Sequence, residues 1–380
     1  MRAPLAGVKV VELARILAGP WAGQTLADLG ADVIKVEAPE GDDTRRWGPP
    51  FIERAGDRSA AYFHAANRGK RSITVDFRTP EGQALVLDLV ADADVLIENF
   101  KVGGLAKYGL DDASLRAVNP RLIYCSITGF GQTGPDADRP GYDFIAQGAS
   151  GLMSITGEPD GPPQKSGVAI VDLFTGVYAT TAILAALHQR GPDGPGQHID
   201  MALLDVATTM LANQAINYLA TGAVPVRMGN AHANLAPYQV FDCADGWIII
   251  ATGNDPQYRR LCDLLGLPDM AQHPDFATNA DRLRNRAAMT AALAGATLQR
   301  TKADLMDACV AHGVPADLIH DIGEVFADPQ VIHRQMQLDL GGIPGVRSPF
   351  RFSGADLALD RPSPKLGEHA AEIVAELQRR

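Results

Sequence analysis

The sequence predicts an α/β protein, with a large domain built on an open, mostly parallel, Rossmann-like sheet and a smaller α+β domain. Short apolar runs alternate with helical segments through the first third of the chain, which indicates β–α–β units and therefore parallel strands. The pattern is then helical from Leu173, and two short strands around the turn Asp245-Gly246 mark a second, smaller unit.

The large domain is expected to begin with a β–α–β unit. Val8–Leu13 (VKVVEL) is an apolar strand, Ala22–Leu29 is a helix that ends at Gly30, and Ala31–Glu37 is the next strand. The remaining elements of this part follow in order as the strand Ser72–Phe77, the helix Pro80–Ala91 with Pro in its first turn, and the strands Asp94–Glu98 and Leu122–Ile127.

The second half of the chain gives the domain boundaries. Leu173 to about Leu219 is expected to be helical except for the Gly/Pro loop Gly191–Gly196, and helical segments also lead to about His312. The other expected elements are the strands Tyr238–Phe241 and Trp247–Ala251 and a final helix over Gly367–Gln378. We therefore assign residues 1–220 and 327–380 to the large domain and residues 221–326 to the small one.

Composition narrows the class of protein. The 380 residues are 46% hydrophobic and 21% charged, no uninterrupted apolar run is long enough to cross a bilayer, and MRAPLAGVKVVEL lacks a signal-peptide pattern. The four cysteines stand singly without CxxC, which argues against a disulfide framework or a metal site and favours the cytoplasm. A net charge of −11 argues against nucleic-acid or membrane binding, so an anionic ligand needs a local basic site.

The glycine-rich run Thr128–Gly134 (TGFGQTG) contains a formal GxGxxG after a strand. The loop-like segment Pro135–Gly141 follows it, whereas a dinucleotide fingerprint must open a helix, so a nicotinamide site is disfavoured. GxSxG, P-loop, HExxH and HxE…PCxxC motifs are also missing from the sequence.

Basic residues gather in three early loops near predicted strand ends: Thr44–Trp47 (TRRW), Asn67–Arg71 (NRGKR), and Asn99–Lys101 (NFK) with Lys107. Arg and Lys in converging loops of an open α/β sheet suit phosphate groups. The alternative for each residue is ordinary solvated charge, but the set, in an acidic protein, favours a phosphate-rich cofactor.

Asp172 is the one formal charge between Lys165 and Arg190, inside an apolar run. It can be a helix N-cap before Leu173. It can also be a carboxylate nucleophile held in an apolar pocket, where burial raises its pKa and strips away water. The sequence pattern leaves both interpretations open.

Six segments recur in the order of a known family. The sequence resembles class III CoA-transferases, which include formyl-CoA transferase, carnitine CoA-transferase and succinyl-CoA:dicarboxylate CoA-transferases. The matching segments are Leu17–Glu37, Asn67–Phe77, Ile97–Leu110, Ser126–Asp143, Gly167–Ala179 and Gly229–Phe241.

The resemblance implies an interlocked homodimer and a metal-free acyl-CoA:carboxylate CoA-transferase. Asp172 falls on the family's catalytic aspartate, which forms an aspartyl–acyl anhydride and then an aspartyl-CoA thioester. The carried-over coenzyme A contacts are Arg68, Lys70, Arg71, Asn99, Phe100, Lys101 and Lys107. The loop Gly129, Phe130 and Gly131 is the candidate shield and oxyanion donor.

The family also contains α-methylacyl-CoA racemases, which carry Gly-His-Asp where this chain has Gly141-Tyr142-Asp143. A tyrosine with an ordinary pKa of about 10 is a poor acid/base at neutral pH, so we rank the racemase below transfer. The segment Gly229–Phe241 looks more like succinyl-CoA-using transferases, whose acceptors are dicarboxylic or hydroxy acids. His232 is either a contact for a distal carboxylate or an ordinary loop residue.

Overall fold

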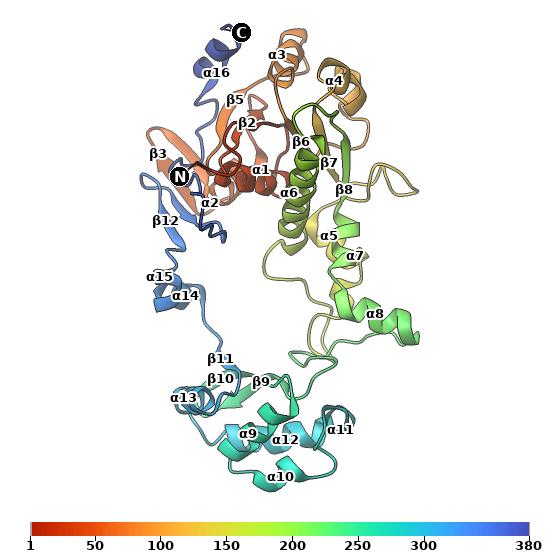
Figure 1. The fold of residues 1–380 in the computed structure, drawn as a ribbon, viewed down its shortest axis with the longest axis vertical. Coiled ribbons are helices and arrows are strands. Elements are labelled where there is room, and N and C mark those ends of the chain that lie inside the picture. The colour runs from red at the N-terminus through yellow and green to blue at the C-terminus, as the bar shows by residue number, and fades with distance from the viewer. Residues whose placement is uncertain (1, 380) are drawn as a thin grey trace. The chain divides into compact units, whose positions relative to one another are not determined.

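The computed structural model describes residues 2–379, which form two compact units. The first unit comprises Met1–Leu152, Lys165–Leu211 and Pro329–Arg380, and the second comprises Met153–Gln164 and Ala212–Asp328. The division differs from the expected domain bounds mainly at Met153–Gln164, which groups with the second unit. Figure 1 draws the helices and strands of both units.

The first unit is built on a six-stranded parallel sheet with the strand order β5-β2-β1-β6-β7-β8. Its strands are β1 (Lys9–Glu12), β2 (Asp32–Glu37), β5 (Arg71–Thr74), β6 (Val95–Glu98), β7 (Ile123–Thr128) and β8 (His198–Ala202). The parallel α/β expectation is therefore confirmed. The strand β8 was missed, because HIDMA lies at the sheet edge, where only Ala202 is buried, and shows no apolar run.

Helices cover both faces of this sheet (Figure 1). One buried cluster joins β1 and β7 to α1 (Ala18–Asp28) and α6 (Ile170–Arg190). The opposite cluster joins the sheet to α3 (Pro80–Val90), α4 (Asp112–Val118) and α16 (Ala370–Leu377). Shorter elements of this unit are the antiparallel pair β3 (Phe51–Arg54) and β4 (Asp57–Ala60), and the helices α2 (Ala61–Ala65), α5 (Asp143–Ala149) and α7 (Leu203–Thr209).

The helix α6 is the one described helix that is long and apolar enough, by length and composition, to cross a membrane. The sequence had suggested that no segment was. In this unit α6 packs along α1 and β7 and buries Val171, Ala179 and Ile183 in the core. We therefore describe it as a core helix.

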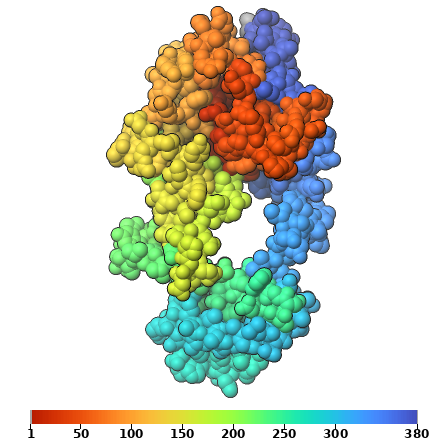
Figure 2. All heavy atoms as spheres, turned by 180° about the vertical axis from the view of Figure 1, so that it is seen from behind, coloured from red at the N-terminus to blue at the C-terminus, as the bar shows by residue number. Residues whose placement is uncertain are grey.

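The C-terminal segment returns to the first unit. It carries α15 (Pro329–His333) and the hairpin β12 (Gln337–Asp339) and β13 (Pro344–Val346). Figure 2 shows this blue segment against the orange N-terminal residues. Backbone bonds secure the contact: Gly69 N donates to Arg361 O, and His369 N donates to Ser72 O.

The second unit contains a three-stranded antiparallel sheet in the order β11-β10-β9. Its strands are β9 (Tyr238–Cys243), β10 (Gly246–Ala251) and β11 (Ala316–Leu318). Its helices are α8 (Ala212–Thr221), α9 (Asp255–Leu264), α10 (Pro268–Gln272), α11 (Asn279–Arg284), α12 (Arg286–Thr297), α13 (Lys302–His312) and α14 (Ile322–Ala327). The hairpin turn places Gly246 at φ 142°, a conformation that favours glycine.

Candidate active site

A cavity of about 260 Å³ opens in the first unit, and Asp172 is part of its wall. The loops after β1, β6 and β7 line it, together with Tyr142 and Leu203. In the sheet, β2 and then β5 follow on one side of β1, whereas β6, β7 and β8 follow on the other. The order in which successive strands are added therefore reverses between β1 and β6. Ligands bind at such a switch point at the carboxyl ends of parallel strands.

Asp172 lies in the first turn of α6, and its side chain does not cap the helix. Asp143, on α5, does this instead: its Oδ1 accepts from Val171 N at 2.7 Å and from Asp172 N at 3.1 Å. Gln147 holds Asp143 by donating to its Oδ2 at 2.6 Å. The capping interpretation of Asp172 is therefore wrong, and its carboxylate, only 9% exposed, belongs to the cavity.

The pKa of Asp172 is raised to about 7, first by burial and second by the negative charge of Asp143. Burial disfavours the ionised carboxylate, and a like charge beside it acts in the same direction. Near neutral pH the side chain therefore changes between a protonated acid and a poorly hydrated carboxylate. The latter is the form that can attack an electrophilic carbonyl.

The variant Asp143→Asn tests this electrostatic coupling. Removing the neighbouring charge should shift the acidic midpoint of kcat/KM for an acyl-CoA donor downward, by up to about 1 pH unit. Turnover should fall about tenfold, because the new amide opposes the amide of Gln147. The Asp193→Asn variant, which changes an exposed carboxylate, is the control, and a midpoint that stays or rises in Asp143→Asn would contradict the assignment.

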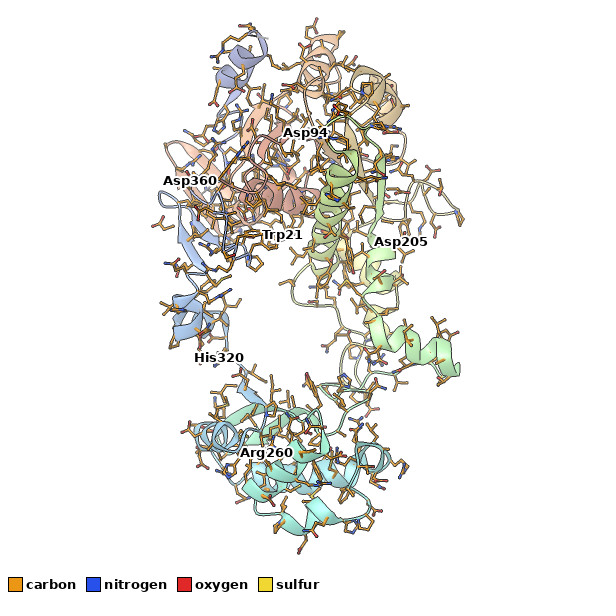
Figure 3. The ribbon with its side chains drawn as sticks, in the orientation of Figure 1. Trp21, Asp94, Asp205, Arg260, His320 and Asp360 are labelled. Atoms are coloured by element: carbon orange, nitrogen blue, oxygen red, sulfur yellow. The ribbon has the colours of Figure 1, made fainter. Side chains whose placement is uncertain are left out.

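Close packing of α6 on α1 sets the position of Asp172. Gly176 is one helical turn further along α6, on the same face. A Cβ built on Gly176 would lie 2.8 Å from Ala18 O and 2.9 Å from Trp21 Cβ, so only glycine lets the helices approach this far. Trp21, labelled in Figure 3, belongs to α1. Asp172 is thereby carried to the beginning of α1, where Leu17 and Ala18 line the same cavity.

The loop between β1 and α1 is held from two sides. Ile16 adopts φ 73°, which is strained for a β-branched residue. Asn99 accepts from Arg15 N at 2.8 Å and donates to Arg15 O at 2.6 Å. Lys35, fully buried, donates to Ala14 O and pairs with Asp42 at 3.0 Å. Asn99 was expected to contact coenzyme A. In the structure both its amide oxygen and its amide nitrogen are hydrogen-bonded to the backbone of Arg15.

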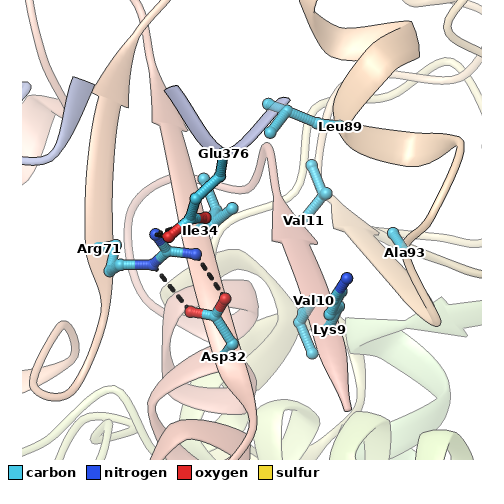
Figure 4. A pocket seen from close by; sticks show the side chains of 9 residues that line it. All are labelled: Lys9, Val10, Val11, Asp32, Ile34, Arg71, Leu89, Ala93 and Glu376. Atoms are coloured by element: carbon cyan, nitrogen blue, oxygen red, sulfur yellow. Dashed lines mark hydrogen bonds and ion pairs between the residues drawn. The ribbon is translucent and has the colours of Figure 1, made fainter. Parts of the chain in front are cut away.

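Three expected coenzyme A residues are instead buried in internal ion pairs. Arg68 pairs with Asp28 at 2.5 Å, and Lys70 pairs with Glu12 at 2.8 Å. Figure 4 shows Arg71 beside a separate cavity, bonded to Asp32, with Glu376 next to it. The charges of these three residues are thus already neutralised within the chain, and the coenzyme A contacts expected of them stay predictions.

The other basic residues lie in the open. Lys101 and Lys107 are exposed and line a second cavity of about 310 Å³, which shares Phe100 and Lys101 with the Asp172 cavity. Neither lysine has a carboxylate partner among residues 2–379. Sequence reasoning missed Arg78, which also lines this second cavity and is bonded to Asp76. Its position just past the expected strand Ser72–Phe77 was the available signal.

Two of the remaining predicted residues, Gly129 and Tyr142, line the Asp172 cavity, and the other residues of the glycine loop make contacts of their own. Gly129 lines the Asp172 cavity, but Gly131 N donates to Thr128 Oγ1 at 2.9 Å and is not free for an oxyanion. Phe130 stacks under Arg139 at 4.5 Å. Tyr142 lines the cavity and is 58% exposed.

Sequence reasoning missed Tyr62. Burial raises the pKa of its phenol, and the negative charges of Asp172 and Asp143 raise it further. His232 lies in the second unit.

The fold and this cavity together define an α/β enzyme with a buried, ionisable carboxylate beside a second cavity that contains Lys101 and Lys107. The chain matches the model of CoA-transferase family III over residues 5–370, and it therefore belongs to that family and is a CoA-transferase.

Three relatives illustrate the match. The chain is 59% identical to succinate–glutarate CoA-transferase of Agrobacterium fabrum over 99% of this chain and 96% of that protein. It is 40% identical to human succinyl-CoA:glutarate CoA-transferase, over 99% of this chain and 86% of that protein. It also resembles the crystal structure of a CAIB/BAIF family protein from Brucella suis, with a TM-score of 0.91, 62% identity and coverage of 99% and 100%.

Proposed function

We propose that the protein moves coenzyme A from succinyl-CoA to a dicarboxylic acid, with glutarate as the first candidate. The observation that carries the proposal is Asp172, a buried carboxylate with a pKa near 7 in the wall of a cavity at the switch point of the sheet. The names of the relatives supply the substrate class.

The proposed chemistry passes through Asp172 in four exchanges. The carboxylate attacks the succinyl thioester carbonyl, forming a mixed anhydride and releasing the CoA thiolate. The thiolate attacks the aspartyl carbonyl, forming an aspartyl-CoA thioester and releasing succinate. The acceptor carboxylate then displaces the thiolate, which finally attacks the acceptor's acyl carbon and frees Asp172. Each step exchanges one activated acyl group for another, so no ATP is needed.

The cavity that contains Lys101 and Lys107 is the proposed position of the CoA nucleotide. Both lysines are exposed cations, whereas Arg78 in the same wall is paired with Asp76. Phe77, Phe100 and Tyr108 pack edge to face here and offer an aromatic surface beside them. Because this cavity shares residues with the Asp172 cavity, a pantetheine arm bound along Phe100 would lead toward the carboxylate.

The racemase alternative has less support. Proton exchange needs an acid/base on each side of the α-carbon. No histidine among residues 2–379 lines the Asp172 cavity, and Tyr142, where the racemases have histidine, is largely exposed.

The interlocked homodimer is also part of this proposal. The helix α6 leaves Phe174, Val177 and Tyr178 exposed, an apolar stripe that suits burial against a second chain.

The four cysteines are unpaired and buried, which supports a cytoplasmic location.

A transfer assay tests the function. Purified protein is incubated with succinyl-CoA and, separately, with glutarate, adipate, malonate or a hydroxy acid, and thioesters are identified by mass. We expect glutaryl-CoA and succinate in equal amounts, without ATP. Hydrolysis alone with every acid would contradict transfer. Deuterium entering the α-carbon of a 2-methylacyl-CoA without an acceptor would instead indicate the racemase.

A further inference from the structure

The turn from β1 to α1 contains a backbone conformation that a β-branched residue rarely adopts. Ile16 has φ 73°, in the left-handed region. Ile16, Leu17 and Ala18 all line the Asp172 cavity. A left-handed residue other than glycine persists only where its surroundings enforce that conformation, and such residues cluster at functional sites. The contacts that enforce it here are therefore candidates for a role in the cavity.

Asp42 binds the turn at the strained residue itself. Ile16 N donates to both carboxylate oxygens of Asp42, at 3.4 Å to Oδ1 and 3.3 Å to Oδ2. The side chain of Asp42 is buried and is held in turn by Thr44, whose N and Oγ1 donate to Oδ1 at 3.0 and 2.8 Å. Asp42 N donates to Glu37 Oε2 at 3.0 Å. An acceptor fixed on so many sides can keep an N–H group in one orientation.

Lys35 keeps Asp42 ionised and binds the same turn. Its Nζ lies 3.0 Å from Asp42 Oδ2 and 3.0 Å from Glu12 Oε1, and it donates to Ala14 O at 2.9 Å. Burial by itself would raise the pKa of Asp42, but the positive charge of Lys35 outweighs it, and this pKa is lowered to about 2. The bond from Ile16 N is therefore made to a full anion, which is the stronger kind of hydrogen bond.

The turn also determines how the chain enters α1. Leu17 occupies the N-cap position without a side-chain cap, and Ala18 is the first residue of the helix. The rest of α1 is buried against α6 in the core. If Ile16 left the left-handed region, the chain would enter α1 in another direction, and α1 could not follow. The displacement would then fall on Leu17 and Ala18, in the wall of the Asp172 cavity.

We propose that Asp42 is a positioning residue for CoA transfer: with Lys35 it holds Ile16 in the left-handed conformation and so fixes the cavity wall at Leu17 and Ala18. The inference rests on the proposed function, in which Asp172 is the nucleophile. Asp42 is only 1% exposed, so it acts through the backbone of Ile16 and not by contact with a substrate. Because reacting groups must be placed to within about 1 Å, a relaxed turn should slow the chemistry more than it weakens substrate binding.

The test combines Asp42→Asn with Ile16→Gly. The neutral amide weakens the bond to Ile16 N, so kcat for transfer from succinyl-CoA to glutarate should fall about 10- to 100-fold, while the KM for succinyl-CoA changes less than about threefold. Glycine adopts a positive φ without a steric penalty, so adding Ile16→Gly should raise kcat again by about tenfold, although it deletes a second side chain. A residue needed only for stability would not be rescued by a further deletion.

Ala55→Gly is the matched control. Ala55 also has a positive φ, 46°, but it lies in the exposed turn between β3 and β4. Added to Asp42→Asn, it should relieve a similar backbone strain and leave kcat where Asp42→Asn put it. Equal recovery with both glycines would mean that stability alone is restored. That result, or no recovery with Ile16→Gly, would overturn the positioning role.

A second variant covers the case in which Asp42→Asn does not fold. Asn99→Ala releases Arg15 on the other side of the turn and leaves the buried ion pairs intact, so it decides by the same comparison of the two glycines. If wild type transfers CoA and only the rescue is missing, the positioning role alone has failed. If wild type transfers CoA to no dicarboxylic acid, the proposed function has failed, and the positioning role falls with it.

Discussion

Replacement of Asp172 by Asn is expected to abolish CoA transfer, with a loss on the order of 10⁴-fold or more, as when other covalent nucleophiles are removed. The amide has the shape of the carboxylate but cannot form an anhydride. Wild-type protein exposed briefly to succinyl-CoA and then to hydroxylamine should carry the label at Asp172 by peptide mass, and the variant should carry none.

The same substitution is expected to stabilise the protein. The pKa of Asp172 is about 7 in the folded protein against 3.8 ordinarily, so the folded state holds the proton more tightly. Wild type therefore loses stability as the pH rises from about 4 to about 7, and the loss persists above that. A variant without this ionisation avoids a penalty on the order of 2–4 kcal/mol at pH 8.

Thermal unfolding at pH 5 and pH 8, at one protein concentration, measures this effect. The Tm advantage of Asp172→Asn should be several degrees at pH 8 and clearly smaller at pH 5. The Asp193→Asn variant, which changes an exposed carboxylate, should show no such pH dependence. If Asp172→Asn keeps measurable transfer, the nucleophile is another group, and if its Tm advantage is equal at both pH values, the buried ionisation is wrong.

Gly176→Ala is expected to lower kcat about 100-fold with little change in the KM for acyl-CoA. The added methyl carbon would lie 2.8 Å from Ala18 O, which is backbone, so the helices α1 and α6 must separate. A displacement of reacting groups by about 1 Å can cost about 100-fold in rate. Alanine improves helix propensity by about 1 kcal/mol, but overpacking costs about 1–3 kcal/mol, so a small net destabilisation is expected.

Gly295→Ala is the matched control, since it also changes a helical glycine but nothing lies within 4 Å of the new Cβ. It should leave activity unchanged and raise Tm slightly. Wild-type kcat in Gly176→Ala would show that helix contact does not position Asp172.

The sheet was predictable where strands are buried on both faces. Short apolar runs in the sequence predicted β1, β2, β6 and β7, and the structure confirms a strand at each of these places. The edge strand β8 and the three-residue β11 have no such pattern, because edge and short strands are held by pairing with a neighbour. Local sequence does not contain that neighbour.

The basic residues show the same limit in the site. In sequence Arg68, Lys70 and Lys101 are equivalent cations in loops of an α/β domain. In the structure the first two meet Asp28 and Glu12, while Lys101 remains exposed beside a cavity. A carboxylate from a distant segment decides which cation is free, and neither spacing nor composition reports that contact.

The sequence by itself determined the parallel α/β class and the second α+β unit, and it singled out Asp172 as a candidate, because periodicity and an isolated charge in an apolar run are local properties. The tertiary structure decided that Asp143 and not Asp172 caps α6, and that Gly176 allows α1 to approach α6 closely. Those outcomes depend on which atoms from separate segments come into contact in the folded chain. Burial makes these contacts important for stability, because a polar or charged group removed from water needs a partner.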